Sequence, residues 1–216
     1  MTHFSERSIN GLLESRIDAG DFPSAVYLVG RGDEVVFSDA LGNAVVVPEV
    51  IPAELATIYD LASLTKVLVT TLLATIMIDR GELAIETGLS DVLPESIGSP
   101  NHNTTILELA THTSGLPAWR PLYLLAEDRA DVLSVVLSTP ATPVRDVVYS
   151  DLNFILLSFV IERLTGKRID EAAAEFIFKP LGLKDTGYRP SVELRQRIAA
   201  SENGNRFERE TCENEG

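Results

Sequence analysis

The most constraining feature of the sequence is a run of twelve residues, 67–78, in which threonine is the only residue that is not fully apolar. The run is too short to span a bilayer, which takes about 20 residues. A helix that is apolar on every side is a buried helix rather than a surface helix. We therefore expect this segment in the core of a globular fold, which a chain of 216 residues is long enough to form.

Before residue 60 the sequence predicts a helix and a hairpin. Apolar residues at spacings of three and four predict a helix over 5–19, which Gly20 ends. Two β-rich runs, 25–29 and 34–37, are joined by a Gly-Arg-Gly-Asp turn and predict a β-hairpin. The apolar residues 43–55 are interrupted by two prolines, which indicates an extended connection rather than a regular element.

After residue 60 the patterns are helical, and several of the segments end at glycine or proline, which are typical helix stops. The expected helices are 63–80, 105–111, 130–138, 153–165, 169–178 and 192–200.

The predicted fold class is therefore mixed α/β, of the α+β kind, in three parts. Residues 1–59 hold the N-terminal helix and the hairpin of a sheet layer, 60–190 form an all-helical region, and 191–216 form a charged helix and a solvated acidic tail. A two-stranded hairpin is marginal in water. Its open edges require further strands, a covering helix or a second chain, so a complementing chain or a dimer through the sheet edge is a candidate partner.

Composition narrows the possible partners. Eighteen Lys and Arg against 32 Asp and Glu give a net charge of −14, which repels nucleic acids and anionic membranes. With one cysteine, Cys212, and three scattered histidines, no metal site is expected. No cofactor is expected either. The first residues lack the layout of a secretory signal, which favours a cytoplasmic location.

A Ser-x-x-Lys motif stands directly before the apolar run. Its spacing places Ser63 and Lys66 on one face of the helix start, with their side chains within reach. A serine hydroxyl becomes an effective nucleophile when a nearby base accepts its proton, and burial and the helix dipole both disfavour a charged lysine. We predict Ser63 as the nucleophile, Lys66 as the base and the Ser63 backbone N–H as an oxyanion donor. Alone, the motif also fits a helix cap and a solvated lysine.

Two further segments carry candidate residues. Tyr149 precedes an apolar helix. If its hydroxyl lies beside Lys66, the positive charge would lower the pKa of the phenol, so that tyrosinate could take and return the proton of Ser63. Asp151 follows at the start of the same helix, where its simplest role is that of a helix cap. His112 lies in a turn, and because the chain has no G-x-S-x-G motif we expect this histidine to have a structural, hydrogen-bonding role.

Four segments, taken in order, resemble the serine β-lactamase-like superfamily, most closely its class C, penicillin-binding-protein-like and esterase members. They are Ser63-x-x-Lys66, Thr111–Pro117, Tyr149–Phe154 and Pro180–Gly187, within a resemblance that runs from about Phe4 to about Asn205. The resemblance implies a partial β-lactamase-like fold and a serine hydrolase. In it, Ser63 forms an acyl-enzyme with a small ester or amide, Lys66 and Tyr149 transfer the proton, and water releases the acid.

Two departures from the superfamily's pattern limit this expectation. Asp151, expected to bind substrate, stands where many members have Asn, and a carboxylate cannot donate to a substrate carbonyl as an amide does. An ester or small amide is thus favoured over a β-lactam. Members that this chain resembles are also longer, and their C-terminal strands carry a third motif and a second oxyanion donor. The alternatives are a truncated or split form that acts as a binding or complemented module, and a D-Ala-D-Ala carboxypeptidase.

Overall fold

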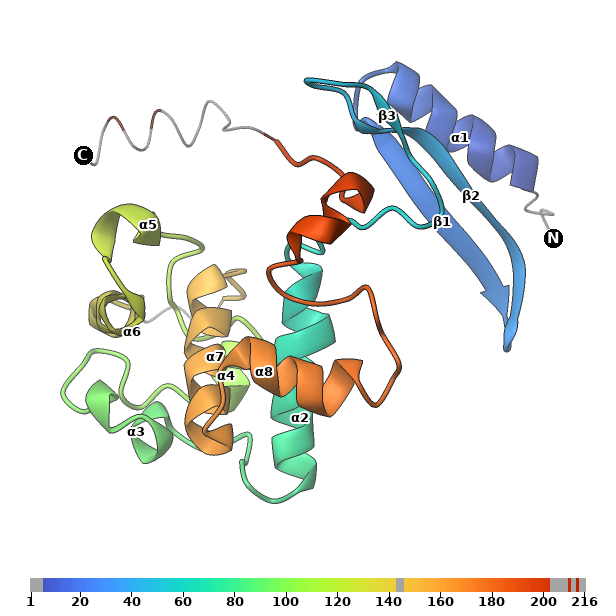
Figure 1. The fold of residues 1–216 in the computed structure, drawn as a ribbon. Helices are drawn as coiled ribbons and strands as arrows, with labels where there is room; N and C mark the ends of the chain where they lie inside the picture. The colour runs from blue at the N-terminus through green and yellow to red at the C-terminus, as the bar shows by residue number, and fades with distance from the viewer. Residues whose placement is uncertain (1–5, 143–145, 203–209, 211–212, 214–216) are drawn as a thin grey trace. The chain divides into compact units, whose positions relative to one another are not determined.

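The computed structural model describes residues 6–142, 146–202, 210 and 213 (Figure 1). Two compact units make up the fold. The described residues up to Asp60 belong to the first unit together with Arg189–Glu202, and Leu61–Tyr188 belong to the second. The predicted division into three parts stays a prediction. Residues 189–202 cluster with the N-terminal unit, and most of the predicted acidic tail lies outside the described residues.

The first unit is a small sheet with one helix. Helix α1 (Glu6–Asp18) contacts β2 (Glu34–Val45), and β2 pairs antiparallel with β1 (Ser24–Arg31) in the register that puts Ser24 opposite Gly42. The predicted helix and hairpin are confirmed. A third strand, β3 (Ile51–Pro52), pairs with the far side of β2. The expectation that 43–55 holds no regular element is therefore wrong, because residues on both sides of the first proline pair with each other.

The segment after Arg189 also differs from the predicted helix 192–200. It forms a 3₁₀ helix, η4 (Val192–Arg197), and then extends. Ile58 N–H donates to the carbonyl of Arg197, and Ala199 N–H donates to the carbonyl of Ile58. Ala200 N–H donates to the carbonyl of Ala44 in β2. These long-range hydrogen bonds give backbone groups after η4 partners from distant parts of the chain in place of helical ones.

The second unit is helical, as predicted, and it contains short helices that the sequence analysis did not predict. Its elements are η1 (Lys66–Thr71), α2 (Leu72–Asp79), α3 (Leu89–Val92), η2 (Pro94–Ser96), α4 (Ile106–Ala110), α5 (Leu122–Leu125), α6 (Arg129–Ser138), α7 (Asp151–Thr165), α8 (Ile169–Ala173) and η3 (Ala174–Phe178). Helices α4 and α6 begin where their sequences provide a cap. Thr105 accepts a hydrogen bond from Glu108 N–H, and Asp128 accepts one from Asp131 N–H.

Helix α7 lies at the centre of the second unit. It contacts α2, α3, α4, α6, α8 and η1 (Figure 1). Its buried residues are Leu152, Asn153, Phe154, Leu156, Leu157, Val160 and Ile161. The predicted core run 67–78 is buried on one face only, because Leu73 and Met77 are fully buried whereas Val67 and Leu72 are exposed. The core is thus built around α7, with the 67–78 run packed on one side of it.

The predicted helix at 63–80 is also less regular than expected. Residues Lys66–Thr71 form a π-helical turn, and the regular α-helix starts at Leu72. The Thr71 hydroxyl donates to the carbonyl of Lys66 at 2.8 Å. A side-chain hydrogen bond into the helical ladder is a known cause of such irregularity. Wide turns of this kind are frequent at functional sites.

Candidate active site

Ser63 lies in a tight turn immediately before the helix that carries Lys66. Three successive backbone hydrogen bonds build this turn, from the N–H groups of residues 64, 65 and 66 to the carbonyls three residues earlier. Ala62, just before the serine, has a φ of +43°. A residue other than glycine in this left-handed region is strained, and such strain concentrates at sites where a side chain must be held in one place.

Lys66 is the centre of the polar cluster. Its Nζ donates to Ser63 Oγ at 3.2 Å and lies 2.6 Å from Asp151 Oδ1. The same Nζ lies 5.0 Å from the centre of the Tyr149 ring. The Lys66 side chain is 14% exposed, against 41% for Asp151. The structure therefore brings together Ser63, Lys66, Tyr149 and Asp151, all of which the sequence singled out.

The charges in this cluster move two pKa values in opposite directions. Burial acts to lower the pKa of Lys66, but hydrogen bonds to Asp151 and Tyr149 outweigh it, so that the pKa is raised overall. Hydrogen bonds with Ser63 and then with Lys66 lower the pKa of the Tyr149 phenol. The sequence had invoked a destabilised ammonium at Lys66. In the structure the ammonium is stabilised instead, because the carboxylate of Asp151 lies 2.6 Å from it. The sequence argument had not included this carboxylate.

The segment that carries Tyr149 and Asp151 is anchored by the loop 111–118. Ser150 is fully buried. Its hydroxyl donates to the carbonyl of Pro117 at 2.7 Å, and its backbone N–H donates to Nδ1 of His112 at 3.0 Å. Asp151 N–H donates to the carbonyl of Ala118 at 2.8 Å. The hydrogen-bonding role predicted for His112 agrees with these contacts.

Sequence reasoning missed Ser114 and Asn153, which form a buried connection between the loop and α7. Ser114 Oγ donates to Asn153 Oδ1 at 2.6 Å, and Asn153 Nδ2 lies 3.4 Å from His112 Nδ1. Asn153 has no exposed surface. An asparagine between the apolar residues Leu152 and Phe154 was the available signal, because a buried amide requires polar partners.

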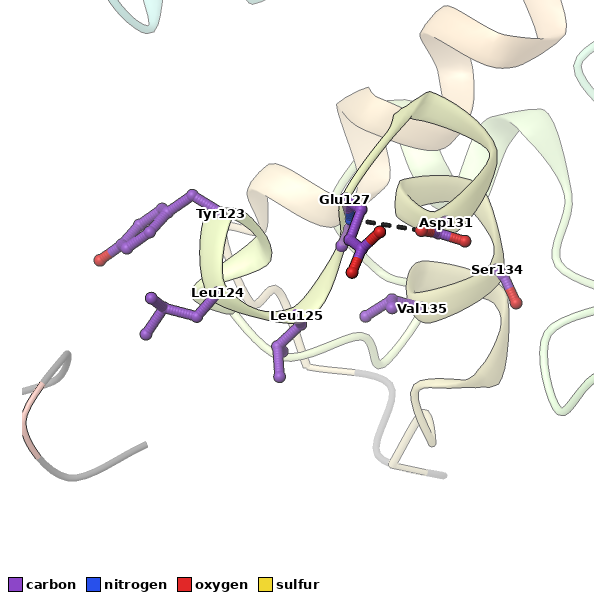
Figure 2. A pocket seen from close by; sticks show the side chains of 8 residues that line it. Tyr123, Leu124, Leu125, Glu127, Asp131, Ser134 and Val135 are labelled. Atoms are coloured by element: carbon purple, nitrogen blue, oxygen red, sulfur yellow. Dashed lines mark hydrogen bonds between the residues drawn. The ribbon is translucent and has the colours of Figure 1, made fainter. Parts of the chain in front are cut away.

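No group of three metal-ligating side chains comes together within the part of the chain that the structure describes. In the same residues no helix is both long and apolar enough to cross a membrane. One surface pocket lies between α5 and α6, where Leu124, Leu125 and Val135 line it beside the hydrogen bond from Glu127 N–H to Asp131 (Figure 2). It shares no lining residue with the Ser63 cluster.

The sequence is similar to a known protein family and to several named proteins. The family model described as Beta-lactamase matches residues 9–214. The chain is 30% identical over 218 residues to a protein of Escherichia coli K12 named "Putative D-alanyl-D-alanine carboxypeptidase", covering 89% of this chain and 50% of that protein. A protein of the same name from Salmonella agona is 29% identical, over 90% of this chain and 50% of its own length. The chain thus spans about half the length of the curated relatives it matches.

Solved structures show the same relationship. A class C beta-lactamase from Rhodobacter sphaeroides has a TM-score of 0.79 and 27% identity, over 90% of this chain and 54% of that one. EstCE1, titled a hydrolase with promiscuous acyltransferase activity, has a TM-score of 0.78 and 22% identity, over 90% of this chain and 55% of its own. The structure is thus a partial β-lactamase-like fold, as the resemblance implied. With the family model matching nearly the whole sequence, the chain belongs to the beta-lactamase family.

Proposed function

We propose that the site is that of an acyl hydrolase that works through an acyl-enzyme on Ser63. The observation that carries the proposal is the Ser63 hydroxyl at 3.2 Å from Lys66 Nζ, in a cluster that also lowers the pKa of Tyr149. A nucleophile, a proton acceptor with a lowered pKa and a fixed positive charge are the parts that acyl transfer needs.

In the proposed reaction Tyr149 is the general base and Lys66 stays protonated. Ser63 Oγ attacks the acyl carbon while its proton moves to the tyrosinate of Tyr149. The tyrosine then gives that proton to the leaving oxygen or nitrogen, and the acyl–serine ester remains. Water attacks this ester with tyrosinate again as the base, and Ser63 recovers a proton as the acid leaves. The Ser63 backbone N–H stays a predicted oxyanion donor.

Asp151 points to the substrate class, which we propose to be small esters or amides. Its carboxylate accepts hydrogen bonds and cannot donate them, and one of its oxygens is already held by Lys66. An amide side chain at this position could donate to the carbonyl of a β-lactam side chain, whereas a carboxylate would repel it. The second candidate is a D-Ala-D-Ala carboxypeptidase, favoured by the name of the Escherichia coli relative with 30% identity.

The test is a comparison of Asp151→Asn with the parent chain on three substrates. They are a p-nitrophenyl ester, a chromogenic cephalosporin and a D-Ala-D-Ala peptide, with Ser63→Ala as the inactive control. We expect acylation of the parent by the ester to be faster than by the cephalosporin. The Asn variant should shift that ratio toward the cephalosporin by about tenfold, the value of one hydrogen bond to the substrate. Faster release of D-alanine than of p-nitrophenol would favour the carboxypeptidase. An unchanged ratio would remove Asp151 from substrate selection.

A further inference from the structure

His112 forms hydrogen bonds with the segment that carries Tyr149. Its Nδ1 accepts the Ser150 backbone N–H at 3.0 Å, and its own carbonyl accepts the Val148 N–H at 2.9 Å. The residue between these two is Tyr149. His112 therefore holds the backbone on both sides of the proposed general base, and the inference below rests on the function proposed for Tyr149.

The hydrogen bond to Ser150 defines the protonation state of the ring. Ser150 has no exposed surface, so its N–H needs an acceptor within the protein. Nδ1 can accept only if it carries no proton, which places the remaining proton on Nε2. The amide of Asn153, 3.4 Å from the same Nδ1, adds a second donor. Protonation would turn Nδ1 into a donor that faces two other donors, the Ser150 N–H and the Asn153 amide. Both hydrogen bonds would then be lost.

The ring also packs directly on the catalytic tyrosine. The centres of the His112 and Tyr149 rings are 4.6 Å apart with their planes tilted by 38°. The His112 and Phe154 rings are 5.1 Å apart and tilted by 34°. These distances fall within the range of favourable aromatic contacts. Because the Tyr149 side chain is otherwise largely exposed, this contact restricts where its hydroxyl can point.

The backbone of His112 is itself in an uncommon conformation, with a φ of +59°. Histidine, asparagine and aspartate enter this region more often than other residues that carry a side chain, but it remains unfavourable. In this conformation Nδ1 lies opposite the Ser150 N–H. Strain of this kind at a binding or catalytic segment is a basis for inferring function.

We propose that His112 is a positioning residue for Tyr149, acting in its neutral form through the Ser150 hydrogen bond and the ring contact, and that its protonation releases the tyrosine and switches the site off. The groups that face the ring are Lys66, Asp151 and Tyr149. Burial and then the Lys66 charge lower the pKa of His112, and the Asp151 charge opposes them. The neutral form thus persists at neutral pH and is lost in acid.

Two variants separate the two contacts of the ring. His112→Asn keeps an acceptor near the position of Nδ1 and tolerates the positive φ, but it lacks the ring and does not titrate. His112→Phe keeps a ring and loses the acceptor. His102→Asn is the matched control, because His102 lies in the same unit, hydrogen bonds to the carbonyl of Ser99 at 2.8 Å and makes none of these contacts.

The first measurement is NMR of the full chain with labelled histidine and tyrosine, which requires no turnover. We expect the neutral His112 to carry its proton on Nε2 and to titrate below the ordinary pKa of 6.5, and the Tyr149 and Ser150 signals to shift with that titration. The same shifts should be absent in His112→Asn and unchanged in His102→Asn. A His112 proton on Nδ1 at neutral pH, or Tyr149 signals that ignore the titration, would overturn the proposal.

The second measurement is the rate of Ser63 modification by a fluorophosphonate against pH. In the parent chain we expect two successive losses as pH falls, one through the pKa of Tyr149 and one through that of His112. His112→Asn should show only the first loss. At pH values where His112 is neutral, His112→Phe should react at least about tenfold more slowly than the parent chain, as expected for a misplaced catalytic group, and the two rates should converge where His112 is protonated. Two losses that persist in His112→Asn would contradict the proposal. If Ser63 is not modified at all, the proposed function fails, while the NMR experiment still decides the role of His112.

Discussion

At the scale of single residues, the proposed proton transfer depends on which groups the Lys66 ammonium contacts. Its ammonium group pairs with Asp151 at 2.6 Å and hydrogen bonds to Ser63 at 3.2 Å. A lysine with a raised pKa is a poor base at neutral pH, whereas its positive charge beside Tyr149 favours the tyrosinate. In the proposed mechanism Lys66 therefore acts through its positive charge. The hydrogen bond from Ser63 and this charge together lower the pKa of Tyr149.

Replacement of Lys66 tests this assignment. In Lys66→Met the pKa of Tyr149 should rise toward its usual range, because the hydrogen bond and the positive charge from Lys66 are lost while the contact with Ser63 remains. In the pH profile of Ser63 modification by a fluorophosphonate, the step that requires tyrosinate should then move to higher pH. Titration of tyrosinate absorbance, with Tyr149→Phe subtracted, measures the shift.

Lys66→Arg is the matched control, because it keeps the charge and should keep the pKa of Tyr149 low. If the methionine variant titrates like the parent chain, Lys66 does not activate the tyrosine, and the original hypothesis that Lys66 itself is the base would regain support.

At the scale of elements, the loop 111–118 supports the segment that carries Tyr149 and Asp151. Gly115 has a φ of +81°, and a Cβ added there would lie 2.1 Å from the carbonyl oxygen of Thr142. Thr142 N–H in turn donates to the carbonyl of Gly115 at 2.9 Å. The backbone therefore approaches this position too closely for any side chain, and the loop depends on glycine here.

Gly115→Ala should therefore destabilise the second unit by about 2–4 kcal/mol, from backbone strain and from displacement of Thr142. Gly98→Ala is the matched control. Gly98 has a φ of +85° but nothing within 4 Å of the added Cβ, so it should cost only about 1 kcal/mol from the strained conformation. Urea unfolding followed by circular dichroism compares the two variants. Equal losses would show that the close approach at Thr142 does not matter.

The elements also show what a sequence can predict. Helices α4 and α6 could be predicted because their caps and apolar spacing are local signals. Strand β3 and the extended residues after η4 depend on pairing with distant residues, which local patterns do not contain. The three catalytic candidates and the proposed substrate-binding residue Asp151 were predictable from motifs. The Ser114–Asn153 contact was not, because it joins residues 39 positions apart.

At the scale of the whole molecule, the proposed site and the outer edges of the sheet belong to different units. Every residue of the proposed site lies within Leu61–Tyr188, where loop and helix hydrogen bonds position it. In the first unit, β1 and β3 are the outer strands of the sheet as far as the structure describes it. A complementing chain or a second copy at such an edge stays a prediction, as does the contribution of a second oxyanion donor by further strands.

The measurement that tests the central claim most directly is mass spectrometry of the 216-residue chain after incubation with a fluorophosphonate, with Ser63→Ala as the control. We predict one adduct per chain, located on Ser63 and absent from the control, because the serine, its charged neighbour and the proposed base all come from one unit. An adduct elsewhere, or a chain that is folded by circular dichroism and carries no adduct, would contradict the claim that this unit assembles a working nucleophile.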